Sequence, residues 1–174
     1  PSGNVKRPLI FANYGRPQDF DALYAAGLSV SGKIVIVRYG QCFRGLKVMN
    51  AQALGARAVL IYSDPIDDGY SVGAVYPHGP WRPASGVQRG SVQFNSLCAG
   101  DPMRVDPRYA QKTQSSVQDI CGYTFEDLIP SIPSLPLSYE DAQPLLEALA
   151  GTKSAKEIFG SDFKGGLNIS YSVG

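Results

Sequence analysis

The sequence has little of the residue chemistry that catalysis and metal binding use. It contains one histidine, His78, and three cysteines in 174 residues. A catalytic zinc site needs three protein ligands, normally histidines and carboxylates, but no His-Glu-x-x-His motif or cysteine pair at ligand spacing occurs here. The Gly-x-Ser-x-Gly turn of a serine nucleophile is missing too. We therefore expect no metal site, a loop position for His78, and no enzymatic activity of the chain on its own.

Long apolar runs and a charge of one sign are also missing. No run approaches the roughly 20 residues that cross a bilayer, and the first residues show no signal-peptide pattern. The formal net charge is +1, with 16 basic and 15 acidic residues scattered along the chain. This distribution favours neither nucleic-acid binding nor membrane contact. We expect one domain over residues 1–174, excised from a longer protein.

Short apolar runs predict a mixed α/β fold. Residues 34–37 and 58–62 are unbroken apolar segments, typical of strands buried on both faces. Between them, Leu46, Met49 and Ala53 recur at helical spacing. A connection this short predicts two parallel strands joined by a right-handed helical crossover.

Further elements are expected on both sides of this unit. The sequence predicts strands over residues 9–13, 87–94 and 167–172, and helices over 19–26 and 138–149. Ser138 and Asp141 have the spacing of a capping box at a helix start. Pro144 predicts a kinked or late-starting first turn of that helix.

Glycine and proline are concentrated between Asp64 and Pro107, which predicts a long surface loop. Loops of this length often carry function. The alternative is a packed Ω-loop held by Trp81.

The three cysteines allow one pair and one free thiol. Cys98 and Cys121 flank a polar segment without apolar periodicity, and a disulfide between them would close a loop. The alternative is two separately buried thiols in a reducing compartment. Cys42 is expected to stay free, buried and unreactive.

The stretch from Gly32 to Tyr62 resembles the protease-associated (PA) domain. That pattern is a Gly-Lys-hydrophobic strand, a turn with Cys, Phe, Arg and Gly, and then Lys-Val-x-Asn-Ala-Gln, here Lys47 to Gln52. Five further pieces resemble the PA domain of the glutamate carboxypeptidase II and transferrin receptor family, the M28B zinc peptidases. They are Tyr62-Ser-Asp-Pro65, Gly86-Val-Gln-Arg-Gly90, Ala99-Gly-Asp-Pro102, Ile132-Pro133 and Tyr139-Glu-Asp-Ala-Gln143.

The resemblance implies a PA-domain fold, with an open mixed β-sheet or barrel-like core, flanking helices and a long Gly/Pro-rich loop. In this family the zinc ion and the peptidase activity belong to a separate domain. We therefore expect no cofactor in this chain and a non-catalytic role in the wall and lid of a substrate site. The expected partners are the peptidase domain of the same polypeptide and a peptide with a free C-terminal carboxylate, while homodimer formation by the parent protein stays open.

The resemblance also implies site residues. Phe43 and Arg44 match the family positions that face the active site, where the arginine holds the terminal carboxylate of the substrate. The residues alone favour a surface Arg44 that pairs with an acid of its own domain, and the resemblance favours the substrate contact instead. Ser91 stands where the family has an asparagine, which puts a preference for glutamate-like side chains in doubt. The segment from Met103 to Arg108 departs from the family's calcium-binding turn, so calcium is not predicted.

One sequon, Asn168-Ile-Ser170, marks Asn168 as a candidate N-glycosylation site. Together with the expected disulfide it favours the secretory pathway, in a vacuolar, lysosomal or extracellular location.

These residues distinguish three functions. Phe43 and Arg44 favour the substrate-binding PA domain of an M28B-type carboxypeptidase or aminopeptidase. The alternative is a protein-interaction or cargo-binding PA module of a receptor-like or vacuolar sorting protein. An autonomous enzyme lacks a catalytic constellation.

Overall fold

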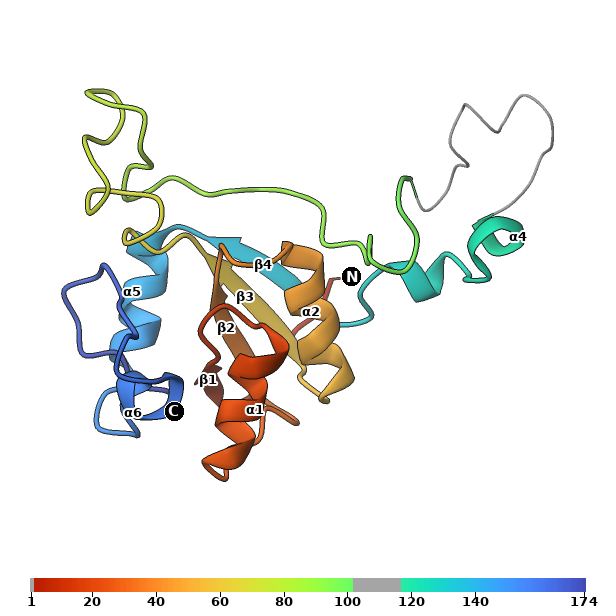
Figure 1. Cartoon of the computed structure of the whole chain (residues 1–174), viewed down its shortest axis with the longest axis horizontal. Coiled ribbons are helices and arrows are strands. Elements are labelled where there is room, and N and C mark those ends of the chain that lie inside the picture. The colour runs from red at the N-terminus through yellow and green to blue at the C-terminus, as the bar shows by residue number, and fades with distance from the viewer. Residues whose placement is uncertain (1, 102–116) are drawn as a thin grey trace.

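A parallel β-sheet forms the centre of the molecule (Figure 1). The computed structural model describes residues 2–101 and 117–174. Each strand pairs in parallel with the next along the chain. The strands are β1 (Leu9–Phe11), β2 (Ile34–Arg38), β3 (Ala58–Tyr62) and β4 (Ser134–Leu137). The α/β fold class is confirmed, and this open sheet is parallel throughout the described residues.

Helices flank the sheet on two sides. They are α1 (Pro17–Ala25), α2 (Arg44–Ala53), α4 (Val117–Cys121), α5 (Tyr139–Glu147) and α6 (Ala155–Phe159), with a 3₁₀ turn η1 (Glu126–Leu128). Figure 1 shows α5 and α6 to one side of the strands and α2 to the other. The predicted strand–helix–strand unit of β2, α2 and β3 is confirmed.

The core is built on both faces of β2. Val35, Ile36 and Val37 are completely buried, although successive side chains of a strand point to opposite faces. Helices on the two sides of the sheet therefore explain why this segment is an unbroken apolar run. Burial contributes about 1.5–3 kcal/mol for each large apolar side chain. On one face Phe11 packs edge-on against Phe163, with ring centroids 6.0 Å apart.

Two predicted strands are wrong. Residues 87–94 form no strand, and Phe94 N–H donates a single 2.7 Å bond to the Leu128 carbonyl instead of joining a ladder. Residues 167–172 also form no strand, because Ile169 N–H donates to the Leu167 carbonyl and turns the backbone back on itself. Only an isolated bridge joins Ser172 to Ser154.

The start of α5 follows the predicted capping pattern. Ser138 Oγ accepts a 3.0 Å bond from Asp141 N–H, and the helix begins directly at Tyr139. The expected late start is therefore wrong. Pro144 lies inside the helix, where its missing N–H leaves one carbonyl of the preceding turn without its helical donor.

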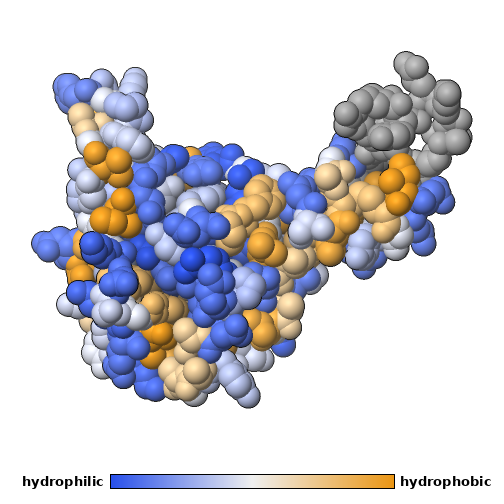
Figure 2. Space-filling model, in the orientation of Figure 1, coloured by the Kyte–Doolittle hydropathy of each residue, from blue (hydrophilic) through white to orange (hydrophobic). Residues whose placement is uncertain are grey.

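The long loop is confirmed as far as residue 101, since residues 63–101 hold no helix or regular strand. Its first part closes on itself around Trp81, which bridges to Val75 and whose carbonyl accepts a 2.9 Å bond from Tyr76 N–H. This supports the packed-loop alternative for that part. The chain then crosses above α2 to an arm that carries α4 (Figure 1). Figure 2 shows apolar surface along this arm.

Candidate functional site

The candidate site lies at the N-terminus of α2, which follows the carboxyl end of β2. Gly40 and Gln41 have φ angles of 100° and 64°, so two successive left-handed residues reverse the chain after the strand. Phe43 is the N-cap residue and Arg44 the first residue of the helix. The partial positive charge of a helix N-terminus adds to the charge of Arg44, which favours an anion here.

Arg44 has an unused hydrogen-bond donor. Its guanidinium carbon lies 4.9 Å from the centre of the Phe43 ring, and its side chain is half-buried. Within residues 2–101 and 117–174, Arg44 pairs with no carboxylate, and its buried Nε has no hydrogen-bond partner. The sequence alternative, an ion pair with an acid of the same domain, therefore finds no support in the described residues. An unpaired buried donor costs about 1–3 kcal/mol.

Two glycines bring residues 90–93 against the start of α2. A methyl group at Gly90 would collide with the Arg44 guanidinium, and one at Gly45 would collide with the backbone carbonyl of Gln93. Ser91 lies between these two contacts and is exposed. The structure therefore brings Phe43, Arg44 and Ser91, the three predicted substrate-binding residues, to one surface.

Ser91 is held by its own loop. Its Oγ accepts a 3.2 Å bond from Gln93 N–H. The preceding backbone is fixed by Tyr39, whose hydroxyl donates a 2.8 Å bond to the Gln88 carbonyl. Burial raises the pKa of Tyr39, and the positive charge of Arg44 opposes that rise. Tyr39 thus stays a neutral donor at physiological pH and connects the loop to the end of β2.

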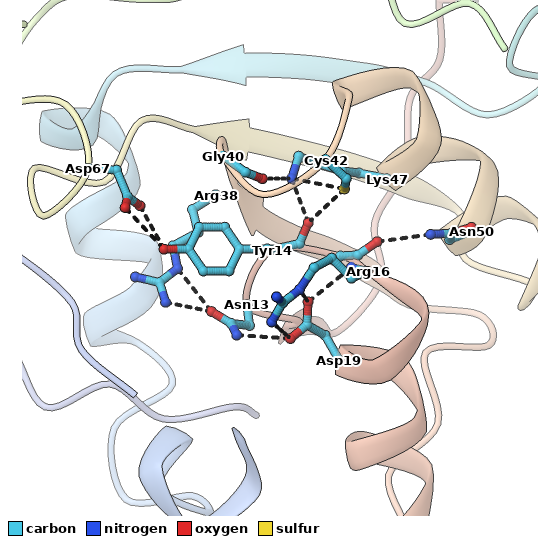
Figure 3. A network of polar contacts seen from close by, with 11 residues as sticks. Asn13, Tyr14, Arg16, Asp19, Arg38, Gly40, Cys42, Lys47, Asn50 and Asp67 are labelled. Carbon is cyan, nitrogen blue, oxygen red and sulfur yellow. Dashed lines mark hydrogen bonds and ion pairs between the residues drawn. The ribbon is translucent and has the colours of Figure 1, made fainter. Parts of the chain in front are cut away.

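A buried lysine holds the turn that precedes Arg44 (Figure 3). Lys47 is completely buried, and its Nζ donates to the carbonyls of Tyr14 at 2.6 Å and Gly40 at 2.7 Å. It also lies 3.5 Å from Cys42 Sγ. Desolvation lowers the pKa of Lys47. Cys42 is a free thiol as predicted, but it is half-buried and not fully buried.

The family motif that contains Lys47 has a common structural role. Asn50 Nδ2 donates a 3.1 Å bond to the Gly15 carbonyl, and Gln52 Oε1 accepts a 2.7 Å bond from Ser131 N–H. Like Lys47, both side chains bind backbone groups of distant loops. The sequence reasoning missed this role. The available signal was three polar residues, Lys47, Asn50 and Gln52, close together on one helix.

A second buried network lies beside the site, at the carboxyl ends of β1 and β2. Asn13 Oδ1 accepts from Arg38 at 2.9 and 2.6 Å, while its Nδ2 donates to Asp19 at 2.9 Å (Figure 3). Asp19 in turn forms an ion pair of 3.0 Å with Arg16. The buried polar groups of this network form hydrogen bonds with one another, so we assign the network a structural role.

The other predicted residues lie apart from Arg44 in the chain. His78 is exposed in the long loop, and Asn168 is exposed near the C-terminus. Cys98 and Cys121 form the predicted disulfide. The segment from Met103 to Arg108, where the calcium question arose, is outside the described residues.

No metal-binding group of three or more His, Cys, Asp or Glu residues occurs in residues 2–101 or 117–174. In the same ranges, no helix combines the length and apolar character that spanning a membrane requires.

Comparison with known proteins places this geometry in a family. Residues 5–93, just over half of the chain, match the family model described as the PA domain. The chain is 42% identical over 178 residues to a "Probable glutamate carboxypeptidase" of Arthroderma benhamiae, covering 99% of this chain and 24% of that protein.

Two further relatives give a similar result. A "Glutamate carboxypeptidase 2 homolog" of Caenorhabditis briggsae is 38% identical, with 99% of this chain and 22% of that protein covered. "Vacuolar protein sorting-associated protein 70" of Saccharomyces cerevisiae is 40% identical, with 86% and 18% covered. The chain thus spans about a quarter or less of the length of these relatives.

Proposed function

This chain belongs to the protease-associated domain family, and on that premise we propose that it forms part of the substrate-binding wall and lid of an M28B-type zinc carboxypeptidase or aminopeptidase. The chain itself is non-catalytic in this proposal. The zinc ion and the peptidase chemistry belong to a separate domain of the same polypeptide. We call that whole polypeptide the parent protein. The relatives named glutamate carboxypeptidase support this assignment.

The unpaired guanidinium of Arg44 is the observation that carries the proposal. A terminal carboxylate would accept two parallel hydrogen bonds from its planar fork, which pairs with no carboxylate among the described residues. Phe43 supplies an apolar wall beside it, and Ser91 supplies an exposed hydroxyl in the adjacent loop. The substrate class is therefore peptides with a free C-terminal carboxylate.

We further propose a secretory location for the parent, in a vacuole or lysosome or outside the cell. The Cys98–Cys121 disulfide supports it, because such bonds persist in oxidising compartments. The vacuolar sorting relative is compatible with the same location.

Kinetics of the parent protein test the role of Arg44. Loss of a charge-assisted bond costs roughly 1.5–3 kcal/mol, so Arg44→Ala should lower kcat/KM by about 10- to 100-fold. Arg44→Lys should recover part of this loss, because an ammonium cannot make the two-pronged contact. A C-terminally amidated substrate should lose little from either change.

Two more variants test the position of the Arg44 guanidinium and control for loss of an arginine. Gly90→Ala keeps the charge of Arg44 but displaces its guanidinium, so it should impair the acid substrate selectively. Arg57→Ala removes an exposed arginine at the start of β3, at the opposite edge of the sheet, and is the matched control. Equal losses on acid and amide substrates, in a folded Arg44→Ala variant, would reject the proposal.

The second candidate is a protein-interaction or cargo-binding module. The similarity to a vacuolar sorting protein favours it. Under this alternative the parent would show no peptidase turnover, and Arg44→Ala would alter sorting of a cargo protein without changing any peptide hydrolysis.

A further inference from the structure

An exposed asparagine near the C-terminus has the chemistry of a modification site. Of the five asparagines in the chain, only Asn168 begins an Asn-x-Ser/Thr sequence, ending at Ser170. Asn168 and Ser170 are both exposed, although Leu167 before them is buried. We propose that Asn168 carries an N-linked oligosaccharide whose first sugar covers a hollow beside it.

The backbone that precedes Asn168 is held in place. Leu167 N–H donates a 3.1 Å bond to the Tyr171 hydroxyl oxygen, and Gly166 N–H donates a 2.7 Å bond to Asp64 Oδ1. The Asn168 side chain makes no hydrogen bond to any described residue. A sugar attached there would break no contact of the folded chain and would project from a fixed support.

The hollow next to the sequon has a size and lining that suit one sugar ring. Its volume is about 420 Å³, and Ile169 and Ser170 of the sequon form part of its wall. The remaining lining residues include Phe163, Tyr171 and Lys156. Aromatic rings pack against the C–H face of a sugar, while an ammonium can donate to its hydroxyl or acetamide oxygens.

The transfer of the sugar is a substitution and requires no oxidant or reductant. Asn168 Nδ2 forms a bond to C1 of a lipid-pyrophosphate-linked N-acetylglucosamine unit. The bond from C1 to the pyrophosphate oxygen breaks, the lipid pyrophosphate leaves with the electron pair, and the amide loses one proton. The cellular transferase selects the acceptor by the Ser170 hydroxyl, so the sequence and its exposure decide the outcome.

Secretion of the 174-residue chain tests the acceptor. An added signal sequence directs the chain into the yeast secretory pathway, and cell extract and medium are analysed before and after peptide:N-glycosidase treatment. The wild type and Ser170→Thr should show a mobility shift that the enzyme removes, leaving aspartate at position 168. Asn168→Gln and Ser170→Ala should show no shift. Asn4→Gln, at an exposed asparagine outside any sequon, should behave as the wild type.

An unshifted wild-type chain in the secretory lumen would overturn the proposal. Hydrogen exchange tests where the sugar lies, because residues 163–171 should exchange more slowly before glycosidase treatment than after it. Equal rates would reject the covered hollow.

For the parent protein the inference rests on the proposed secretory location. If Asn168 is modified in the yeast experiment but not in the parent protein from its own cells, the proposed secretory location is rejected. Asn168 would still be a competent acceptor.

Discussion

The Tyr171 hydroxyl donates a 2.6 Å hydrogen bond to the Asp64 carboxylate, which precedes it by 107 residues. Asp64 is completely buried, and it also accepts from the Tyr62 hydroxyl and from the backbone of Ile66 and Gly166. One carboxylate therefore connects the end of β3 to the C-terminal segment. Burial raises the pKa of Tyr171, so it remains a donor at physiological pH.

Removal of the Asp64 charge should destabilise the fold strongly. Arg38 lies 3.9 Å from Asp64 and is nearly completely buried, so Asp64→Asn would leave that guanidinium without its counter-charge. Breaking a buried pair costs about 3–5 kcal/mol in free energy of unfolding. Tyr171→Phe should cost about 1.5–3 kcal/mol or more, because it removes one bond to a charged group and also the acceptor of Leu167 N–H. Urea denaturation measures both.

The matched control for Asp64→Asn is Asp21→Asn, at an exposed position of α1. It should change the free energy of unfolding by less than about 0.5 kcal/mol. A similarly small change for Asp64→Asn would mean that the buried carboxylate does not hold the two segments together.

The pH dependence of stability should show the titration of Tyr14. Burial raises the pKa of Tyr14 to about 12 from 10.0, with Arg38 opposing and Asp67 adding to the rise. Between these two pH values, the unfolded chain loses the Tyr14 proton while the folded chain keeps it. The unfolded state then binds fewer protons, so stability falls as pH rises through this window.

Urea denaturation at several alkaline pH values checks this expectation. In Tyr14→Phe the free energy of unfolding should fall less steeply with pH. The difference in slope should correspond to at most about one proton. Tyr24→Phe, which removes an exposed hydroxyl on α1, is the control for loss of a tyrosine. An unchanged slope in Tyr14→Phe would show that Tyr14 ionises equally in both states.

The disulfide gives a direct chemical prediction. Alkylation of the denatured, non-reduced protein should label Cys42 alone, because Cys98 and Cys121 are joined. Cross-linking across 23 residues contributes roughly 3 kcal/mol on the chain-entropy model. Reduction should therefore speed proteolysis of the arm more than of the sheet. Labelling of all three cysteines in oxidised material would refute the bridge and weaken the case for a secretory compartment.

The sequence predicted the elements whose pattern is local. Apolar runs identified β2 and β3 because both faces of these strands are buried, and Ser138 marked the start of α5 through its own hydroxyl. The family pattern then selected Phe43 and Arg44. These predictions needed only neighbouring residues or a known motif.

The elements that the sequence did not predict depend on distant partners. Lys47 looks like a solvated helix residue, but carbonyls of two loops surround its ammonium. Residues 87–94 were expected to form a strand, yet no strand among the described residues pairs with them. The contact of residues 90–93 with α2 depends on two glycines, and glycine alone does not show what it approaches.

Gly45→Ala tests that contact, because two effects of known size oppose each other there. Alanine is favoured over glycine within a helix by about 1 kcal/mol, so an open position would gain stability. At Gly45 the new methyl group would meet the backbone carbonyls of Val92 and Gln93, which cannot rotate away as a side chain would. Forcing a methyl group into packed surroundings costs about 1–3 kcal/mol.

The clash should therefore match or exceed the helix gain, and Gly45→Ala should lower the free energy of unfolding or leave it unchanged. It should also move residues 90–93, which include Ser91, away from Arg44. In the parent protein, kcat/KM for an acid substrate should then fall although no polar group has been removed. A gain of about 1 kcal/mol with unchanged kinetics would show that the loop does not rest on the start of α2.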